Sequence, residues 1–379
     1  MISTLVIGGG IGGLSLAREL AIRGLPVTVL EKAPQLNPAG AGIIMNPNAM
    51  RVLERNGLAE AVRLDSWPYL LRETCDSRGR SLAMRDYRPL YEAGKLSVGA
   101  LVHRAHLLDV LYRSLPPAAV RFNVSVRDIE IRPDRVRAQT ERGEVFEADL
   151  LVGADGIHSQ VRSRLFGEIR PRYMGYRSHR LIVDNEAGVR HFTEFLGRGQ
   201  RIGLVPISPA RLYVWTTFNS PQAQPPVLDS VSRFRDAFRQ FTDEHIARVF
   251  SALRSMDGVI STDIEEMALD EWTRGRGALL GDAVHPMTPN IGQGAGMAME
   301  DAAVLAQEIY SGGPDALIRY ARRRKPRVDT VVRISREVGA DGQRSSPVGC
   351  WLRNRRIRRE GRNAEKMQAD LERLLAYPA

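Results

Sequence analysis

The chain has 379 residues, of which 43% are hydrophobic and 26% are charged, and this length corresponds to about two domains of roughly 100–200 residues each. The composition excludes collagen-like, coiled-coil and wholly disordered proteins. No apolar run approaches the ~18–20 residues of a membrane span, and two cysteines are too few for a disulfide framework or a cysteine-rich zinc site. We therefore expect a soluble, cytoplasmic protein without a metal site or a membrane partner.

The excess positive charge lies in the C-terminal part of the chain. The net charge is +10, and the segment from Arg319 to the end holds 17 Lys and Arg against 7 Asp and Glu, with 37 of each in the rest. A basic patch can bind nucleic acid, and the alternative is the solvated surface of a helix. We favour the solvated surface and do not expect a nucleic-acid partner.

The N-terminal residues predict a strand, a helix and a second strand, which together open a βαβ unit. These elements cover residues 2–7, 11–23 and 26–31. Asn46-Pro47 indicates a helix start, because Asn is a good capping residue and Pro fits the first helical position. A hairpin is expected over residues 69–87 and a helix over residues 104–115.

The middle of the chain is rich in short strands separated by Gly and Pro. We expect a meander over 124–146, a strand over 149–153 and four antiparallel strands over 178–183, 189–196, 201–207 and 212–218. Two amphipathic helices follow over 229–253, then a buried strand over 277–281 and a helix over 292–310. A last helical region begins at Asp315 and is expected to break at Pro326. The simplest organisation is a nucleotide-binding fold interrupted by a β-rich domain.

The first motif is Gly8-Gly9-Gly10-Ile11-Gly12-Gly13, a G-x-G-x-x-G between a strand and a helix. Gly8 permits the tight turn, Gly10 lets the backbone approach a pyrophosphate, and Gly13 lets helix and strand pack closely. Glu31 ends the second strand, where a carboxylate accepts hydrogen bonds from a ribose and repels a 2′-phosphate. This favours FAD or NAD over NADP, and a simple glycine-rich turn with a surface Glu is the alternative.

Two further segments have the form of a strand end, a turn and a helix start. One is Gly153-Ala154-Asp155-Gly156-Ile157-His158-Ser159-Gln160-Val161-Arg162, in which Ser159 could cap the helix. The other is Gly281-Asp282-Ala283-Val284-His285-Pro286, followed by Gly292-Gln293-Gly294-Ala295-Gly296. Phosphate-type turns far apart in the sequence suit a long cofactor such as FAD, and ordinary structural loops are the alternative.

These three segments, in this order, resemble the FAD-dependent aromatic hydroxylases, which are the p-hydroxybenzoate hydroxylase-like and salicylate hydroxylase-like single-component monooxygenases. The resemblance extends from about Ile2 to Pro326. It implies an α/β fold, in which a Rossmann-like FAD-binding domain of the glutathione reductase type is interrupted by an antiparallel β-sheet substrate domain, with C-terminal helices. The domains expected are 1–70, 97–170 and 273–335 for FAD, 71–96 and 171–272 for substrate, and 336–379 for the C-terminal helical segment.

The resemblance also implies a set of site residues. The residues expected at FAD are Gly8, Gly10, Ile11, Gly12, Gly13, Glu31, Lys32, Gly42, Arg104, Asp155, Gly156, Gly281, Asp282, Pro286, Gly292, Gln293, Gly294 and Ala295. Candidate substrate contacts are Met45, His191, Tyr213, Trp215 and Pro289, and a packing role is the alternative for His191, Tyr213 and Trp215. The catalysis is centred on the flavin, with His285 and Pro286 as protein candidates. The loop 35–41 lacks the basic, His or Tyr residue that other members often carry, so substrate deprotonation by such a group is not expected.

The family mechanism implies the function. NADH or NADPH reduces FAD, the reduced flavin takes up O₂ to give a C4a-hydroperoxide, and an OH group passes to an aromatic, heteroaromatic or polycyclic small molecule. One alternative is an FAD-dependent oxidoreductase or dehydrogenase of the same fold without oxygen insertion. Another is a non-catalytic flavin-binding protein whose basic tail contacts nucleic acid. A monomer or a homodimer is expected.

Overall fold

The computed structural model describes residues 1–36, 41–222 and 228–376. Its first layer is a six-stranded sheet in the order β18-β19-β12-β1-β2-β8. Strands β1, β2, β12 and β19 run parallel, β8 is parallel to β2, and β18 is antiparallel to β19. The strands are β1 Thr4–Ile7, β2 Val27–Leu30, β8 Val120–Arg121, β12 Leu150–Gly153, β18 Thr273–Arg274 and β19 Gly277–Leu279.

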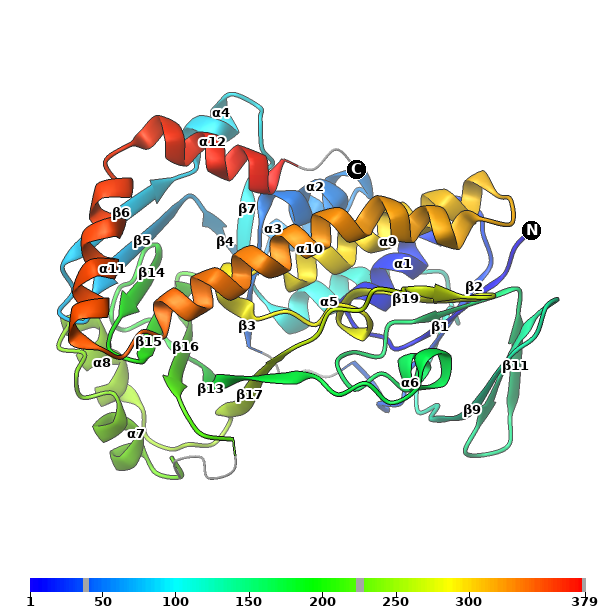
Figure 1. Ribbon diagram of the computed structural model, residues 1–379, viewed down its shortest axis with the longest axis horizontal. Coiled ribbons are helices and arrows are strands. Elements are labelled where there is room, and N and C mark those ends of the chain that lie inside the picture. Colours follow the sequence, from blue (N-terminus) through cyan, green and yellow to red (C-terminus); the bar gives the residue numbers. More distant parts are fainter. Residues whose placement is uncertain (37–40, 223–227, 377–379) are drawn as a thin grey trace.

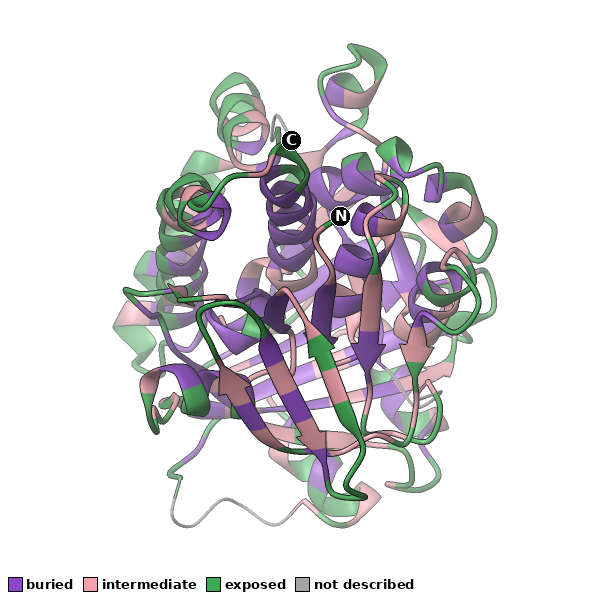
Figure 2. Cartoon of the chain, turned by 90° about the vertical axis from the view of Figure 1, so that its right-hand side faces the viewer, coloured by how far each residue is buried: buried purple, intermediate pink, exposed green. Residues whose placement is uncertain are grey.

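This parallel sheet is buried on both faces. All four residues of β1 and of β12 are buried, as expected for strands that are covered by helices on both sides. Helix α1 (Ile11–Ala21) leads from β1 to β2 and packs against α9 (Gly294–Ser311), which in turn packs against α10 (Ala316–Gly342). Figure 2 shows that the buried residues gather inside these layers. The predicted βαβ start is therefore present.

The second layer is a seven-stranded sheet in the order β17-β13-β16-β15-β14-β5-β6. Its strands are antiparallel except for β14 beside β5. Helices α7 (Val231–Ala237) and α8 (Glu244–Ala252) cover one face with a cluster that includes Phe195, Phe234 and Phe238. The strands are β5 Leu71–Asp76, β6 Ser81–Asp86, β13 Arg172–Asp184, β14 Phe192–Leu196, β15 Gln200–Pro206, β16 Arg211–Asn219 and β17 Ile260–Glu266.

Two three-stranded sheets complete the β-structure. The predicted meander forms β9 (Val126–Ile131), β10 (Val136–Thr140) and β11 (Val145–Ala148) at one end of the molecule (Figures 1 and 2). The other sheet has the order β3-β7-β4, with β3 Gly42–Met45, β4 Ser66–Tyr69 and β7 Gly99–His103.

The remaining helical elements are distributed over both halves of the chain. They are α2 Pro47–Arg55, α3 Ala59–Arg63, α4 Arg88–Glu92, α5 Arg104–Arg113, α6 Gln160–Phe166, the 3₁₀ turns η1 Gly281–Ala283 and η2 Pro289–Ile291, α11 Pro347–Glu360 and α12 Ala364–Leu375. Figure 1 shows α10 running across the molecule from the parallel sheet to the seven-stranded sheet. No helix in the described part of the chain is both long and apolar enough to cross a membrane.

Two sequence expectations need correction. The predicted break at Pro326 is wrong, because α10 continues through this residue. Pro326 lies on the exposed side of α10, where water can hydrogen-bond the carbonyl that the missing N–H leaves free. The helix expected from Gly292 begins at Gly294 instead, since Gly292 adopts a left-handed conformation after the turn η2.

Candidate functional site

The three glycine motifs meet at one edge of the parallel sheet. They follow β1, β12 and β19, and Glu31 follows β2, so all four lie at the carboxyl ends of adjacent parallel strands. The Gly8 Cβ position would lie 2.5 Å from the Ala154 carbonyl oxygen, and Leu280 N–H donates to the Gly153 carbonyl at 2.9 Å. This edge is where nucleotide ligands bind in open α/β sheets.

Glycines of the first motif are required for two different reasons. A Cβ on Gly13 would lie 1.9 Å from the Gly8 carbonyl oxygen, and a Cβ on Gly12 would lie 2.5 Å from the Leu280 side chain. Gly8 also has a φ of 109°, which favours glycine. By contrast, no atom lies within 4 Å of a Cβ built on Gly10. Protein atoms therefore fill the space beside Gly8, Gly12 and Gly13, whereas the space beside Gly10 is open and can take a ligand.

The start of α1 offers unpaired backbone donors beside that open space. Gly10 is the N-cap residue, and no side chain caps the helix. The first N–H groups of a helix and its dipole attract anions such as a pyrophosphate. Ile11 opens this helix.

Glu31 anchors the glycine turn. Its Oε2 accepts a hydrogen bond from Gly9 N–H at 2.6 Å, and its Oε1 accepts one from Ala33 N–H at 2.8 Å. Each carboxylate oxygen has further lone pairs, so the group can still accept hydrogen bonds from a ribose. Lys32 beside it is exposed.

The second motif caps α6 with two side chains. Asp155 Oδ2 accepts from Gln160 N–H at 2.7 Å, and Ser159 Oγ accepts from Arg162 N–H at 2.9 Å, which confirms Ser159 as a helix cap. Gly156 adopts a φ of 80°. Arg162, whose role sequence reasoning missed, donates to the Ala283 carbonyl at 3.0 Å and so joins the second motif to the third.

Asp282 and Arg104 bring two opposite charges that attract each other to the site. Asp282 is exposed, yet desolvation by the surrounding protein raises its pKa against the attraction of His285 and Arg104. Desolvation and Arg180 lower the pKa of Arg104. Neither side chain forms a hydrogen bond with any described residue. Polar groups of this kind fit a bound ligand with hydroxyl or phosphate groups.

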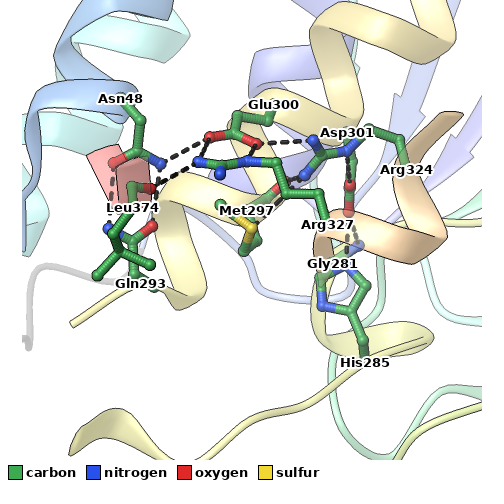
Figure 3. A network of polar contacts seen from close by, with 10 residues as sticks. All are labelled: Asn48, Gly281, His285, Gln293, Met297, Glu300, Asp301, Arg324, Arg327 and Leu374. Atoms are coloured by element: carbon green, nitrogen blue, oxygen red, sulfur yellow. Dashed lines mark hydrogen bonds and ion pairs between the residues drawn. The ribbon is translucent and has the colours of Figure 1, made fainter. Parts of the chain in front are cut away.

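His285 points away from solvent into the helix layer. Its Nε2 lies 2.6 Å from Asp301 Oδ2, and Gly281 N–H donates to the same oxygen at 3.1 Å (Figure 3). Arg324 Nε donates to Asp301 Oδ1 at 2.7 Å, and both side chains are fully buried. Burial alone would raise the pKa of Asp301, but His285 and Arg324 hold it below its usual range.

The network continues from Arg324 across α9. Arg324 and Arg327 both pair with Glu300 Oε2 at 2.7 Å, and Asn48 donates to Glu300 Oε1 at 2.7 Å (Figure 3). The Gln293 side chain is buried and exchanges hydrogen bonds with Asn48. Two carboxylates, Glu300 and Asp301, therefore face two guanidinium groups, Arg324 and Arg327, in this network.

The substrate candidates divide by burial. Tyr213 is buried, and its ring packs so closely on Gly42 that a Cβ built on Gly42 would lie 2.4 Å from it. This burial raises the pKa of Tyr213 to about 12. Met45 is fully buried in a cluster with Leu14 and Val102. The remaining candidates keep some exposed surface: Trp215 and His191 are half-buried, with His191 Nε2 3.1 Å from Glu73, and Pro289 is exposed.

A second buried network, which sequence reasoning did not predict, links the seven-stranded sheet to the turn η2. Glu194 pairs with Arg72 at 2.6 Å and with Arg201 at 3.1 Å. Arg201 also donates to Asn290, and its guanidinium lies 5.4 Å from the Trp215 ring centroid. Burial alone would raise the pKa of Glu194, but the two arginines hold it below its usual range.

Comparisons with known proteins agree with this geometry. Residues 1–335 match the family model described as FAD binding domain. The chain is 35% identical over 367 residues to aurachin C monooxygenase/isomerase of Stigmatella aurantiaca, and 33% identical to 2-heptyl-3-hydroxy-4(1H)-quinolone synthase of Pseudomonas aeruginosa, each covering 94% of both chains. The structure of Klebsiella pneumoniae HpxO complexed with FAD and uric acid superposes with a TM-score of 0.90 at 27% identity, covering 100% of this chain and 97% of that one. The chain therefore belongs to the FAD binding domain family and is an FAD-dependent enzyme of the monooxygenase class, as the sequence resemblance implied.

Proposed function

We propose that this enzyme hydroxylates an aromatic or heteroaromatic small molecule, with electrons from NADH or NADPH and one oxygen atom from O₂. The observation that carries the proposal is the meeting of the three glycine motifs at the carboxyl ends of β1, β12 and β19. Relatives that match nearly the whole chain include enzymes named for aurachin C and for a 3-hydroxyquinolone. Quinolone-type rings are therefore the first substrates to test.

The ADP half of FAD would lie on the first motif. The open space over Gly10 and the uncapped N-terminus of α1 support binding of the pyrophosphate there. Glu31 supports binding of the ribose, and Arg104 and Asp282, which attract each other and form no hydrogen bond with a described residue, would meet the middle of the cofactor. Asp155 and Gly156 lie at the neighbouring strand end and stay proposals of the same kind.

The isoalloxazine end would lie along residues 286–296. No ionised side chain occurs in this segment, and α9 begins there without a side-chain cap. The N–H groups of Gly294 and Ala295 would stabilise negative charge on the ring, because preorganised donors act most strongly where water is excluded. Bound FAD supplies the electron transfer and the O₂ activation, while Pro286, Gly292 and the backbone of Gln293 position it.

His285 would act as a positioning residue. Its Nε2 is engaged by Asp301 and its side chain is buried. The imidazole therefore ties the turn after β19 to α9, and the neighbouring Pro286, which is buried, would contact the cofactor. On the substrate side, Trp215 and Pro289 have surface for an aromatic ring, while Tyr213 and Met45 are buried and would act through packing.

We also propose that the parallel sheet belongs to the FAD-binding domain and the seven-stranded sheet to the substrate-binding domain. The parallel sheet takes its strands from within 1–70, 97–170 and 273–335, and the seven-stranded sheet takes its strands from within 71–96 and 171–272. This division supports an FAD-binding domain interrupted by a substrate domain, with residues 336–379 as a helical addition.

The test is a turnover assay on protein purified with its flavin. NADH and NADPH oxidation is followed in air with a panel of quinolones, phenols and hydroxypyridines, and products are analysed after reaction under ¹⁸O₂. One ¹⁸O atom per product molecule is expected. Product that forms without O₂ in the presence of an artificial electron acceptor, or whose new oxygen comes from water, would favour the dehydrogenase alternative.

A further inference from the structure

The outer side of α11 exposes three large apolar side chains. Val348, Trp351 and Leu352 are 68%, 58% and 53% exposed, and their spacing of three and four residues places them on one side of the helix. Figure 1 shows α11 at the edge of the molecule, where it packs on β6. The helix is therefore held by its other side, and this apolar side is left uncovered.

The side that holds α11 in place is built from specific contacts. Arg353 is buried, and its guanidinium donates to the carbonyl oxygens of Gly342 at 3.2 Å and Gly197 at 3.1 Å. Cys350 is buried beside it. These contacts fix the orientation of the helix, so the exposure of Trp351 and Leu352 does not come from a loosely placed segment.

Arginines extend the apolar row toward the C-terminal end. Arg355 and Arg359 follow Val348 by 7 and 11 residues, which keeps them on the same side of the helix, and Arg362 follows just after it. None of these three arginines forms an ion pair with a described residue. The Arg355 guanidinium lies 5.5 Å from the Trp351 ring centroid. We call Val348, Trp351, Leu352, Arg355 and Arg359 the outer stripe of α11.

The arginines beside the stripe are different, because they have carboxylate partners. Arg356 pairs with Asp341, and Arg358 lies 3.8 Å from Asp76. The outer stripe thus combines exposed apolar groups with arginines that pair with no carboxylate in the described part of the chain. A second copy of this chain would bring like charges together across a symmetric interface, which disfavours self-association through this side.

We propose that the outer stripe of α11 binds an anionic lipid surface, with the enzyme lying on the surface. Trp and aliphatic side chains enter the boundary between headgroups and acyl chains, while Arg attracts anionic headgroups. A nucleic-acid backbone would meet the arginines but would leave Val348 and Leu352 without an apolar partner, so a lipid surface fits the stripe better. The proposal does not depend on the reaction that the enzyme catalyses.

The experiment measures partition of the FAD-loaded enzyme onto vesicles by flotation. Vesicles of phosphatidylcholine with phosphatidylglycerol in equal parts are compared with pure phosphatidylcholine. We expect binding to the anionic vesicles that weakens with added salt. The variants Trp351→Ser/Leu352→Ser and Arg355→Gln/Arg359→Gln should each lower the partition coefficient about tenfold or more.

Matched controls separate the stripe from general surface properties. Leu64→Ser removes a side chain that is 88% exposed elsewhere, and Arg142→Gln/Arg254→Gln removes the same charge from exposed sites outside α11; both should bind as wild type. Stripe variants that bind as well as the controls would overturn the proposal. So would binding to duplex DNA or RNA without binding to vesicles, or a wild-type dimer that Trp351→Ser disperses in the absence of any vesicle binding.

Discussion

Two carboxylates show how single residues support this site. Glu31 links the glycine turn to the segment after β2, because one of its oxygens accepts a hydrogen bond from Gly9 N–H and the other accepts one from Ala33 N–H. Asp301 does not face the cofactor site. It holds His285, Gly281 and Arg324 together from inside the helix layer (Figure 3). One carboxylate thus shapes the binding turn directly, and the other shapes it through the residues behind it.

Replacing Glu31 by Ala should weaken FAD binding by about 10–100-fold. A charge-assisted hydrogen bond is worth roughly 1.5–3 kcal/mol, and the change also releases Gly9 N–H. Glu31→Gln keeps one acceptor and should lose less. The dissociation constant is measured from flavin fluorescence after dilution, with the exposed Glu60→Ala as control. Equal FAD retention by Glu31→Ala and wild type would contradict the assignment.

Replacing Asp301 by Asn should destabilise the protein at neutral pH by about 3–5 kcal/mol, because Arg324 loses a buried partner. The folded protein holds the pKa of Asp301 below its usual range. The wild-type carboxylate therefore stabilises the fold above the unfolded-state pKa of ~3.9, and this stabilisation is lost as the pH falls through the folded-state pKa.

The stability difference between Asp301→Asn and wild type should therefore shrink as the solution becomes acidic. Denaturant unfolding at pH 7 and at successively lower pH measures this difference. Asp270→Asn is the control, since Asp270 lies on the surface and its replacement should change little. A difference that stays constant down to strongly acidic pH would show that the charge of Asp301 does not stabilise the fold.

At the scale of elements, α10 holds the two layers together. It buries Tyr320 and Arg324 before Pro326, and Val328, Val331 and Val332 after it. Tyr320 donates to the Leu279 carbonyl of β19 at 3.0 Å, while Ser335 donates to the Thr288 carbonyl at 2.6 Å. Packing on both sides of the proline therefore outweighs its local cost, and one continuous helix supports the turn after β19 and the loop near η2.

Replacing Pro326 by Ala should stabilise the enzyme by about 2 kcal/mol. Proline inside a helix costs about 3 kcal/mol, and the greater freedom of the unfolded alanine chain takes back at most ~1 kcal/mol. The free energy of unfolding of Pro326→Ala is compared with that of Pro314→Ala, which lies outside the helix. A decrease would show that α10 needs the bend of a proline to follow the sheet.

At the scale of the whole molecule, the C-terminal helix α12 packs against the N-terminal part of the chain. Leu371 and Leu375 of α12 join a cluster with Tyr69 and Tyr87, which come from the first quarter of the chain. Arg327 donates to the Leu374 carbonyl at 3.1 Å, which connects α12 to the network of Glu300. The basic tail expected as a solvated surface is therefore partly structural, because α12 covers an apolar cluster.

Leu371→Ala should cost about 2–5 kcal/mol of stability, the usual range for a buried leucine truncated to alanine. Leu352→Ala, at an exposed site of α11, should cost no more than ~0.5 kcal/mol. Chemical denaturation of both variants measures the two changes side by side. Equal, small effects would mean that the packing of α12 does not contribute to the stability of the fold.

The sequence alone determined the βαβ start, the meander, the hairpin and the three glycine motifs, because these features depend on neighbouring residues. Gly8 to Gly13 form a turn whose shape is encoded locally, and Glu31 comes directly after the strand that positions it. Only the tertiary structure decided that His285 turns toward Asp301, that Met45 is in the core, and that α10 runs through Pro326. Burial and side-chain hydrogen bonds depend on residues far apart in the chain, such as Arg201 and Asn290, and no local pattern records which of them will meet.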